Sequence, residues 1–440
     1  MKKVIVVVLA SIMVLGTLAS TVYFLLESAR ARKSSADPLA DVPEAVVRSF
    51  RFSDFSNMDI SELDLSTIGD EILTYTFSSG TKWPAAEKMP PDTSPDQVMS
   101  LGKDLGLGLK ALHEAGITGK GVAVAVIDKP IIADHEAYSA NLHYIEVRPD
   151  DPKMERTHFH GAACATILAG DYGVAPEAPL YYFAVPDDRE PYKRYAEAMD
   201  MLLEMVETMP EEEKIRIVSV SHGVDVSQSG ASEWQAAIAR AEEQGIIVVY
   251  PGMPELSYTG AGCPPGLDRD DPANYRRWSW TLAKEHVLGR LLESGVSSFE
   301  TAREELKRLL TSDPELNVLH VEAIHTYLYV MELARMDPSA TFEEYLWSMV
   351  TPAPDTLSVP ADYLTVGDNA SPSAYTYFGN GGLSWATPYL AGVLALGLQV
   401  NPSAAPEDLF AAVIETAWTF GEEGMMGKLL NPAGFLDAVR

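Results

Sequence analysis

Short apolar segments alternate with helix-type patterns across the middle of the chain. The apolar segments are 122–127, 180–185, 215–221 and 246–250. Between them, apolar side chains recur at helical spacing over 161–169, 195–206 and 232–244. Continuous apolar runs of this length are typical of strands buried on both faces of a sheet. Strands that alternate with helices predict an α/β fold, here a doubly wound, mostly parallel sheet with helices on both faces.

The first 33 residues have the pattern of a membrane anchor or a signal peptide. The uncharged run Val4–Leu26 follows Lys2 and Lys3 and precedes a basic stretch that ends at Lys33. A helix over this run, at about 1.5 Å per residue, would cross a hydrocarbon core about 30 Å thick. Cleavage after the small residues of Ala29–Ala31 is the alternative. Both predict a domain outside the cytoplasm, either in a single-pass protein of the cell membrane or secreted, with the membrane as a partner only if the helix is retained.

The rest of the chain divides into two parts by composition. Residues 34–93 are polar, apart from a strand-like patch at 72–77, and are expected to form a spacer or a reduced pro-segment. Residues 94–440 form the main domain. Consecutive helical patterns interrupt its α/β rhythm at about 281–350 and predict an inserted helical subdomain. A capping box that begins at Ser297 marks one helix of this insertion.

Three further helices are expected in the main domain. Ser94 can cap a helix that runs into Gly116, since a proline follows it at the first helical position. A second helix is expected over 389–398 after Pro388, and a third over 406–416.

Charge and cysteine content exclude several classes of partner and of fold. The formal net charge is −30, from 63 acidic and 33 basic residues, which argues against nucleic acid as a partner. Two cysteines cannot provide a disulfide framework, and Cys164 in an apolar helical run is expected to be a core residue rather than a bridge to Cys263. His320 and His325 lack the His-Glu-x-x-His spacing of a zinc helix, so no metal site is predicted.

Three short segments carry side chains suited to catalysis. Asp128 ends a buried strand, where open parallel sheets place their sites. His160 opens an apolar helix and is followed at once by Gly161. Ser384 lies in a glycine-flanked turn that leads into a helix, which exposes a hydroxyl and directs backbone N–H groups at an adjacent oxyanion. Taken singly, each has a structural explanation: a strand-terminal acid, a histidine at a helix start and a serine cap.

Together and in this order, the three segments resemble the subtilisin-like serine peptidases. The serine segment of that family is matched at Gly382, Ser384, Ala386, Pro388, Ala391 and Gly392. The run Gly173–Pro176 matches its Gly-Val-Ala-Pro segment, and 218–223 resembles the strand with which its substrates pair. The order Asp, His, Ser differs from the orders of the α/β-hydrolases and of chymotrypsin. The resemblance covers residues 94–440, interrupted by the helical insertion.

The resemblance implies a serine endopeptidase that hydrolyses peptide bonds through an acyl-enzyme. Ser384 would be the nucleophile, His160 the general base and acid, and Asp128 the group that orients the histidine. A peptide or protein is the implied substrate, and no metal or organic cofactor is needed. The implied substrate-binding residues are Val220, Ser221, His222, Gly223 and Gly252. The backbone N–H of Ser384 would donate to the oxyanion.

The second oxyanion donor is where the sequence departs from the family. Met253 stands where the family has asparagine, and a thioether cannot donate a hydrogen bond. Asn369 and Asn380 are possible substitutes. The alternative function is therefore a catalytically weak or inactive protein that binds peptides in the same cleft, and an esterase with the same triad is a third. His158 competes with His160 for the base role, and His222 is either a subsite residue or a surface histidine.

Overall fold

The computed structural model describes residues 54–296 except Arg189 and Ser227, then Thr301, Glu305, Arg308 and Ala353, and finally 355–421 and 427–440. The predicted anchor or signal helix lies outside the described residues. So does most of the predicted helical insertion, including Ser297.

A five-stranded parallel sheet with strand order β3-β4-β2-β5-β6 forms the centre of the molecule. Its strands are β2 Ala123–Asp128, β3 Leu142–Glu146, β4 Leu180–Ala184, β5 Ile215–Ser219 and β6 Ile247–Val249. Every residue of β2 is buried because the strand lies in the middle of the sheet with helices above and below. The predicted alternation of strands and helices is confirmed here, although β3 was not predicted and α6 begins at Pro191, four residues earlier than expected.

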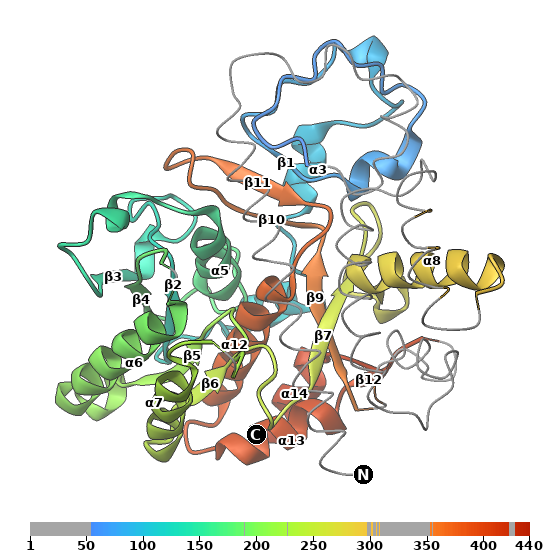
Figure 1. The fold of residues 1–440 in the computed structure, drawn as a ribbon. Coiled ribbons are helices and arrows are strands. Elements are labelled where there is room, and N and C mark those ends of the chain that lie inside the picture. Colours follow the sequence, from blue (N-terminus) through green and yellow to red (C-terminus); the bar gives the residue numbers. More distant parts are fainter. Residues whose placement is uncertain are drawn as a thin grey trace.

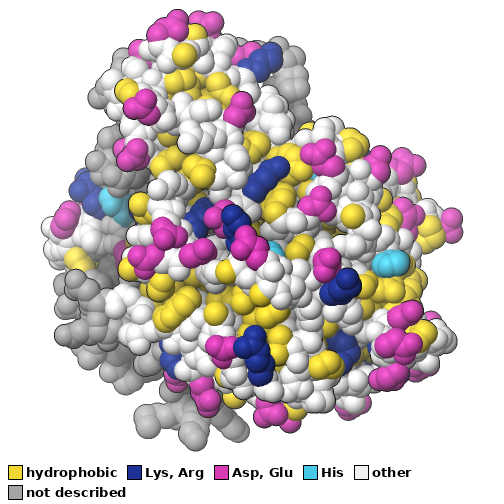
Figure 2. All heavy atoms as spheres, turned by 180° about the vertical axis from the view of Figure 1, so that it is seen from behind, with side chains coloured by type: hydrophobic (Ala, Val, Ile, Leu, Met, Phe, Trp, Pro, Cys, Tyr) yellow, Lys and Arg dark blue, Asp and Glu magenta, His cyan; other side chains and the backbone are white. Residues whose placement is uncertain are grey.

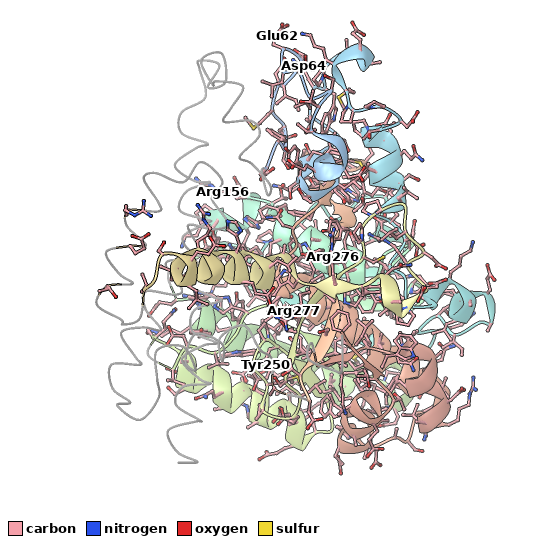
Figure 3. All side chains as sticks on the ribbon, turned by 90° about the vertical axis from the view of Figure 1, so that its right-hand side faces the viewer. Glu62, Asp64, Arg156, Tyr250, Arg276 and Arg277 are labelled. Atoms are coloured by element: carbon pink, nitrogen blue, oxygen red, sulfur yellow. The ribbon has the colours of Figure 1, made fainter. Side chains whose placement is uncertain are left out.

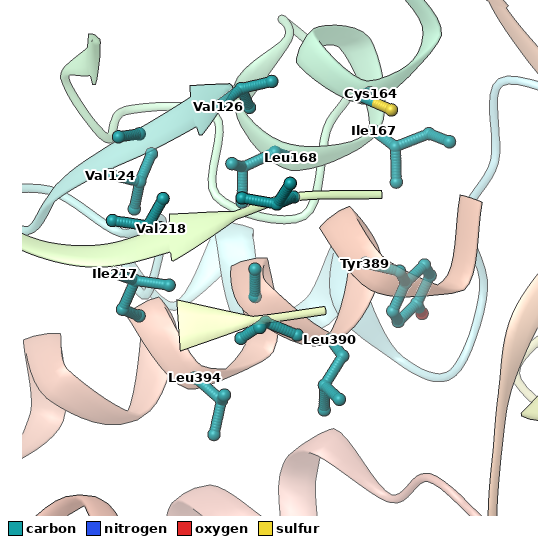
Figure 4. Close-up of a cluster of buried hydrophobic side chains, with 14 of the residues drawn as sticks. Val124, Val126, Cys164, Ile167, Leu168, Ile217, Val218, Tyr389, Leu390 and Leu394 are labelled. Carbon is teal, nitrogen blue, oxygen red and sulfur yellow. The ribbon is translucent and has the colours of Figure 1, made fainter. Parts of the chain in front are cut away.

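Helices cover both faces of this sheet (Figure 1). They are α5 Phe159–Ala169, α6 Pro191–Thr208, α7 Ala231–Glu243 and α12 Leu383–Val400. Helix α5 lies between β3 and β4 in the chain, and α6 lies between β4 and β5. Helix α7 packs with α6, and α12 packs with α5. Figure 4 shows the interface that α5 and α12 form with β2 and β5, where Ile167, Leu390 and Val218 lie buried.

Two smaller sheets contain antiparallel pairs, so the fold is less uniformly parallel than predicted. One is mixed, with the order β12-β13-β9-β7-β8, and the other is antiparallel, with the order β1-β11-β10. The strands of the mixed sheet are β7 Tyr258–Gly262, β8 Arg276–Arg277, β9 Leu357–Asp362, β12 Trp418–Thr419 and β13 Lys428–Leu429. The antiparallel sheet consists of β1 Phe77–Ser78, β10 Leu364–Gly367 and β11 Tyr375–Phe378.

Three sequence-based predictions of local structure were wrong. The helix expected from Ser94 to Gly116 is two helices, α3 Pro95–Leu101 and α4 Leu109–Glu114, because Gly106, Leu107 and Gly108 all have positive φ angles. Ser94 caps α3 as expected, since its hydroxyl accepts from the N–H of Gln97 at 3.4 Å.

The strand expected over 72–77 is mostly the 3-10 helix η1 Gly69–Thr74, with β1 following it. The helix expected after Pro388 begins at Leu383, so that Pro388 lies within its second turn. The missing N–H of Pro388 leaves the Ser384 carbonyl without its helical donor, and the Ser221 hydroxyl donates to that carbonyl at 2.8 Å instead.

The remaining elements are short or peripheral. The helices are α8 Ser279–Glu293, α13 Pro406–Glu415 and α14 Pro432–Val439, and the 3-10 helices are η2 Ala86–Lys88, η3 Ser139–Asn141, η4 Pro152–Glu155, η5 Glu211–Glu213 and η6 Pro272–Asn274. Within the described residues, α12 alone is long and apolar enough to cross a bilayer, but 78% of it is buried inside the fold, which makes it a core helix.

Residues 54–93 contain a second hydrophobic cluster that packs against the main domain. This cluster, built around Phe55, Ile60 and Leu65, also includes Tyr363 and Tyr377 from the main domain. Strand β1 adds to the edge of β11, at the top of Figure 1. The two cysteines are free and buried, in agreement with the prediction that Cys164 is a core residue.

Acidic side chains are spread over the face of the molecule shown in Figure 2. On the face shown in Figure 2, Asp and Glu side chains lie among Lys and Arg side chains and do not gather into one patch. This face therefore shows no single-sign patch to set beside the net charge of −30.

Candidate active site

Asp128 and His160 form a hydrogen-bonded pair at the carboxyl end of the parallel sheet. Asp128 is the last residue of β2, and His160 lies in the first turn of α5. The His160 Nδ1 atom and the Asp128 Oδ2 atom are 2.7 Å apart, and the Lys129 N–H donates to Oδ1 at 2.7 Å. With Nδ1 protonated toward the carboxylate, Nε2 is left as the acceptor that a general base requires.

The carboxyl of Asp128 is ionised at neutral pH. Burial opposes ionisation, but the charge and hydrogen bond of His160 and the contacts with Lys129 outweigh it, so the pKa of Asp128 falls from 3.8 to about 2. A carboxylate held in this way fixes the tautomer of the imidazole and stabilises the imidazolium.

His158 has a structural place beside this pair. It is the N-cap of α5, and its Nδ1 accepts from the His160 N–H at 3.1 Å. Burial lowers the pKa of the His158 ring to about 2. Since its Nδ1 is engaged in capping, His158 is less suited than His160 to serve as the base.

Ser384 lies in the first turn of α12, directly after the Gly381–Gly382 turn. Its hydroxyl donates to the carbonyl oxygen of Ser221 at 3.4 Å, well beyond the usual 2.7–2.8 Å for such a bond. The Ser221 hydroxyl in turn donates to the Ser384 carbonyl at 2.8 Å. Within the part of the chain that the structure describes, no hydrogen bond joins Ser384 to His160. Catalytic hydrogen bonds are often loose without substrate, and rotation about one side-chain bond would release the Ser384 hydroxyl.

Two side chains connect the neighbourhood of Ser384 to the Asp128–His160 pair. The Cys164 Sγ atom donates to the Ser221 hydroxyl at 3.4 Å and lies 3.7 Å from the Ser384 carbonyl oxygen. The ring of Trp385, the residue after Ser384, is centred 5.4 Å from the His160 ring. The structure therefore brings all three predicted catalytic residues into one region, although it does not join the serine to the histidine.

Asp128, His160 and Cys164 also form a possible metal-binding group. One ligand atom from each lies within 4.8 Å of the others. Burial raises the pKa of Cys164 well above 9.0, which disfavours the thiolate that a metal requires. A metal ion would also compete for the atoms of the Asp128–His160 hydrogen bond, so these residues fit proton transfer better than metal binding.

The predicted substrate-binding residues differ in how accessible they are. Ser221 is partly exposed beside Ser384, whereas Val220 and Gly223 are buried. The Val220 N–H donates to the Val249 carbonyl, and the Gly223 carbonyl accepts from Tyr192. Gly252 has a φ angle of 89° in the turn after β6.

His222 is partly exposed, but its ring has aromatic neighbours. Its ring packs against Tyr192 and Tyr195, with ring centres 5.3 Å away in each case. Burial lowers the pKa of the ring to about 4, so the ring is neutral at physiological pH. Its Nε2 atom is buried without a hydrogen-bond partner among the described residues.

The second oxyanion donor remains open. Met253 is buried and lines a cavity of about 610 Å³ between α7, β6 and α13, together with Ile246 and Phe410. The Asn369 side chain donates to the Thr157 carbonyl, and Asn380 accepts from Thr76. Neither asparagine bonds to Ser384. The Ser384 N–H lies in the first turn of α12, where N–H groups have no intrahelical partner, and is well placed to serve as one donor.

The sequence reasoning missed Asp362, which supports the turn before Ser384. This acid ends β9 and accepts the Gly381 N–H at 2.7 Å. The signal that singled out Asp128, an acid at the end of a strand-like apolar run, is also present at Leu357–Asp362.

A comparison with family models identifies the family of this chain. The model of the subtilase family of peptidases matches residues 119–435, which include Asp128, His160 and Ser384. The chain belongs to the subtilase family. The resemblance stated from the sequence is thereby confirmed, and with it the α/β fold of that family.

Individual relatives of this subtilase are distant. The subtilisin-like protease PopC of Myxococcus xanthus is 28% identical over 130 residues, which are 26% of this chain and 27% of that protein. The match thus spans about a quarter of that relative's length.

Solved structures that are similar to this subtilase have low sequence identity. The prenylagaramide maturation protease PagA is 15% identical with a TM-score of 0.43, over 76% of this chain and 98% of that one. A protease from Pseudoalteromonas arctica PAMC 21717 is 16% identical with a TM-score of 0.45, over 78% and 97%. The PatG macrocyclase in complex with peptide is 12% identical with a TM-score of 0.44, over 76% and 95%. Family membership supports a serine-type peptidase function for this chain.

Proposed function

We propose that this subtilase is a serine endopeptidase that acts on peptides or proteins through an acyl-enzyme. The observation that carries the proposal is the 2.7 Å hydrogen bond between His160 and the buried carboxylate of Asp128, with Ser384 close by at the start of α12. An Asp-His pair with a fixed tautomer next to a helix-terminal serine is the arrangement that activates a hydroxyl for attack on a carbonyl.

The proposed reaction begins when the Ser384 hydroxyl turns from the Ser221 carbonyl to the Nε2 atom of His160. His160 takes the hydroxyl proton as the Ser384 Oγ attacks the peptide carbonyl, and Asp128 stabilises the imidazolium. The imidazolium then gives the proton to the leaving amine. Water, deprotonated by His160, hydrolyses the ester and regenerates the free serine.

The proposed oxyanion site contains the Ser384 N–H and a second donor that has not been identified. Loss of a single donor costs roughly 10²–10³ in turnover in related enzymes. With Met253 in the cavity next to α13, we therefore expect slow turnover unless the substrate brings another N–H group into place.

Labelling with a fluorophosphonate probe tests the proposal. The probe should label the wild-type chain, and Ser384→Ala and His160→Ala should abolish labelling. Ser403→Ala is the matched control, because Ser403 is exposed and outside the site, and it should label like wild type. Absence of labelling in wild-type protein with a cooperative unfolding transition would exclude the endopeptidase.

Met253 and the long hydroxyl contact of Ser384 favour one second candidate, a peptide-binding subtilase without turnover. The two candidates differ in their response to Ser384→Ala. An endopeptidase loses all peptide cleavage in this variant, whereas a peptide-binding protein shows no cleavage by wild type and the same peptide affinity in both forms. Comparison of amide and ester substrates separates a peptidase from an esterase with the same triad.

We also propose that the domain acts outside the cytoplasm, attached to the cell membrane through its N-terminal helix or released from it. The apolar run Val4–Leu26 supports this location. N-terminal sequencing of the protein from membrane and soluble fractions tests it. Intact protein in the cytoplasmic fraction alone would contradict both versions.

A further inference from the structure

Both backbone groups of Gly381, three residues before Ser384, are bonded to side chains: the buried Asp362 and the partly buried Trp278. The Gly381 N–H donates to Asp362 Oδ1 at 2.7 Å. The Gly381 carbonyl accepts from the indole N–H of Trp278 at 3.1 Å. Asp362 also accepts from Ser279, at Oδ2 from the N–H at 2.8 Å and at Oδ1 from the hydroxyl at 3.0 Å.

These bonds join the turn before the nucleophile to the start of another helix. Ser279 is the first residue of α8, and Trp278 is its N-cap. Asp362 is 2% exposed, and a carboxylate at this position also compensates the positive end of the α8 dipole. Figure 3 shows Arg276 and Arg277 of β8 beside this end of α8.

The turn is packed too closely to move without breaking these contacts. A Cβ atom added at Gly381 would lie 1.7 Å from the Ala361 carbonyl oxygen and 2.7 Å from the Trp385 ring. The turn is therefore pressed against β9 on one side and against the first turn of α12 on the other. A shift of Asp362 or Trp278 would pass directly to the residues that carry Ser384.

Hydrogen-bond donors from α8 and from the turn at Gly381 favour the ionised form of the Asp362 carboxyl. Arg276 of β8 favours the carboxylate, and its guanidinium also donates to the Tyr363 hydroxyl at 2.6 Å. Burial raises the pKa of Asp362 to about 7 despite these contacts, because the carboxyl is almost fully shielded from water. Hydrogen bonds to a carboxylate that is shielded from water are strong, and their loss leaves a buried polar group unpaired.

We propose that Asp362 and Trp278 are positioning residues for Ser384. Their hydrogen bonds fix the Gly381–Gly382 turn and make its position depend on how the start of α8 packs. The proposal rests on the proposed peptidase function. It makes the docking of α8 a determinant of catalytic rate. A displacement of about 1 Å at the nucleophile is enough to lower turnover by roughly 10²-fold.

Three substitutions in the full chain test the inference. Asp362→Asn replaces one acceptor oxygen with an NH₂ group that faces N–H donors, and Trp278→Phe removes the bond to Gly381 while keeping an aromatic ring. Both should lower kcat, and the rate of fluorophosphonate labelling, by about 10-fold to 100-fold with KM changed less than threefold. Trp280→Phe is the matched control. Trp280 lies two residues after Trp278, in the first turn of α8, and the centres of the two rings are 6.1 Å apart. This control variant should retain at least half of the wild-type rate.

Hydrogen exchange separates failure of this inference from failure of the proposed function. If the positioning role is correct, Asp362→Asn should speed amide exchange together in the turn at 380–384 and in the first turn of α8, whether or not the chain turns over peptide. Unchanged exchange at 380–384, or labelling rates of Asp362→Asn and Trp278→Phe equal to that of Trp280→Phe, would overturn the inference. A wild-type chain that fails to label would refute the peptidase, and the exchange result would still decide the role of Asp362.

Discussion

The two halves of the candidate site are built in different ways. Asp128 and His160 are held by β2 and α5, elements of the central sheet and its covering layer, and are already hydrogen-bonded to each other. Ser384 follows a turn whose contacts come from β9, the start of α8 and the N-terminal segment. The Asp-His half is thus formed by the central sheet and its covering layer, whereas the turn before Ser384 depends on contacts from outside that sheet.

The largest expected effect is on the Asp-His half. Asp128→Asn keeps the shape of the side chain but no longer favours the tautomer in which Nδ1 is protonated and Nε2 accepts. We expect turnover and the rate of probe labelling to fall on the order of 10⁴-fold, with little change in KM. Kinetics with a peptide substrate and the far-ultraviolet circular dichroism of the variant check this prediction. A loss below tenfold in a folded variant would mean that the Asp128–His160 bond is not used in catalysis.

The second prediction concerns pH, because the pKa values of the two buried carboxyls are shifted in opposite directions. The folded pKa of Asp128 is about 2, below 3.8, so its contribution to stability is present above pH 4 and is lost as pH falls toward 2. The folded pKa of Asp362 is about 7, above 3.8, so the folded state holds an extra proton between these values and loses stability as pH rises from 4 to 7. Each window is worth on the order of 2–4 kcal/mol.

Chemical unfolding at several pH values checks both windows. Asp128→Asn should flatten the free energy of unfolding between pH 2 and 4, and Asp362→Asn should flatten it between pH 4 and 7. The slopes are compared rather than the absolute free energies, because each substitution also changes stability directly. Identical slopes in wild type and both variants would show that neither carboxyl is held as the structure indicates.

The third prediction tests whether the N-terminal segment supports the serine half. The Thr76 hydroxyl donates to Asn380 Oδ1 at 2.7 Å, and Thr76 is 2% exposed. Thr76→Val preserves the shape but leaves the Asn380 oxygen without this donor, so we expect a loss of about 1–3 kcal/mol in the free energy of unfolding. The labelling rate of Ser384 should fall several-fold. Denaturant unfolding and probe kinetics give the two values.

Thr93→Val is the matched control in the same segment. The Thr93 hydroxyl has a 3.4 Å contact with the Pro91 carbonyl, away from the turn before Ser384. This variant should behave like wild type in both measurements. If both threonine variants label at the wild-type rate, the Thr76–Asn380 bond does not influence the nucleophile.

The same contrast explains what could be predicted from the sequence. The apolar runs predicted β2, β4, β5 and β6 because strands buried on both faces leave a continuous hydrophobic signal. The contacts of Gly381 could not be predicted, because they join β9, α8 and the turn across long separations in the chain and no local pattern records such pairings. The split of the helix expected after Ser94 was missed because Leu107 adopts a positive φ angle, which its residue type does not indicate.

The smallest expected effect concerns the atom at which the two halves meet. The Cys164 Sγ atom is in contact with the Ser221 hydroxyl and the Ser384 carbonyl, and Cys164 lies on the same helix as His160. If the halves are held independently, Cys164→Ala should change the labelling rate of Ser384 less than threefold, because it removes one buried sulfur atom at a cost of roughly 1 kcal/mol. Cys263→Ala is the control for loss of a buried thiol elsewhere. A tenfold loss of labelling in Cys164→Ala alone would show instead that α5 positions the serine through this sulfur. The positions of His160 and Ser384 would then depend on each other.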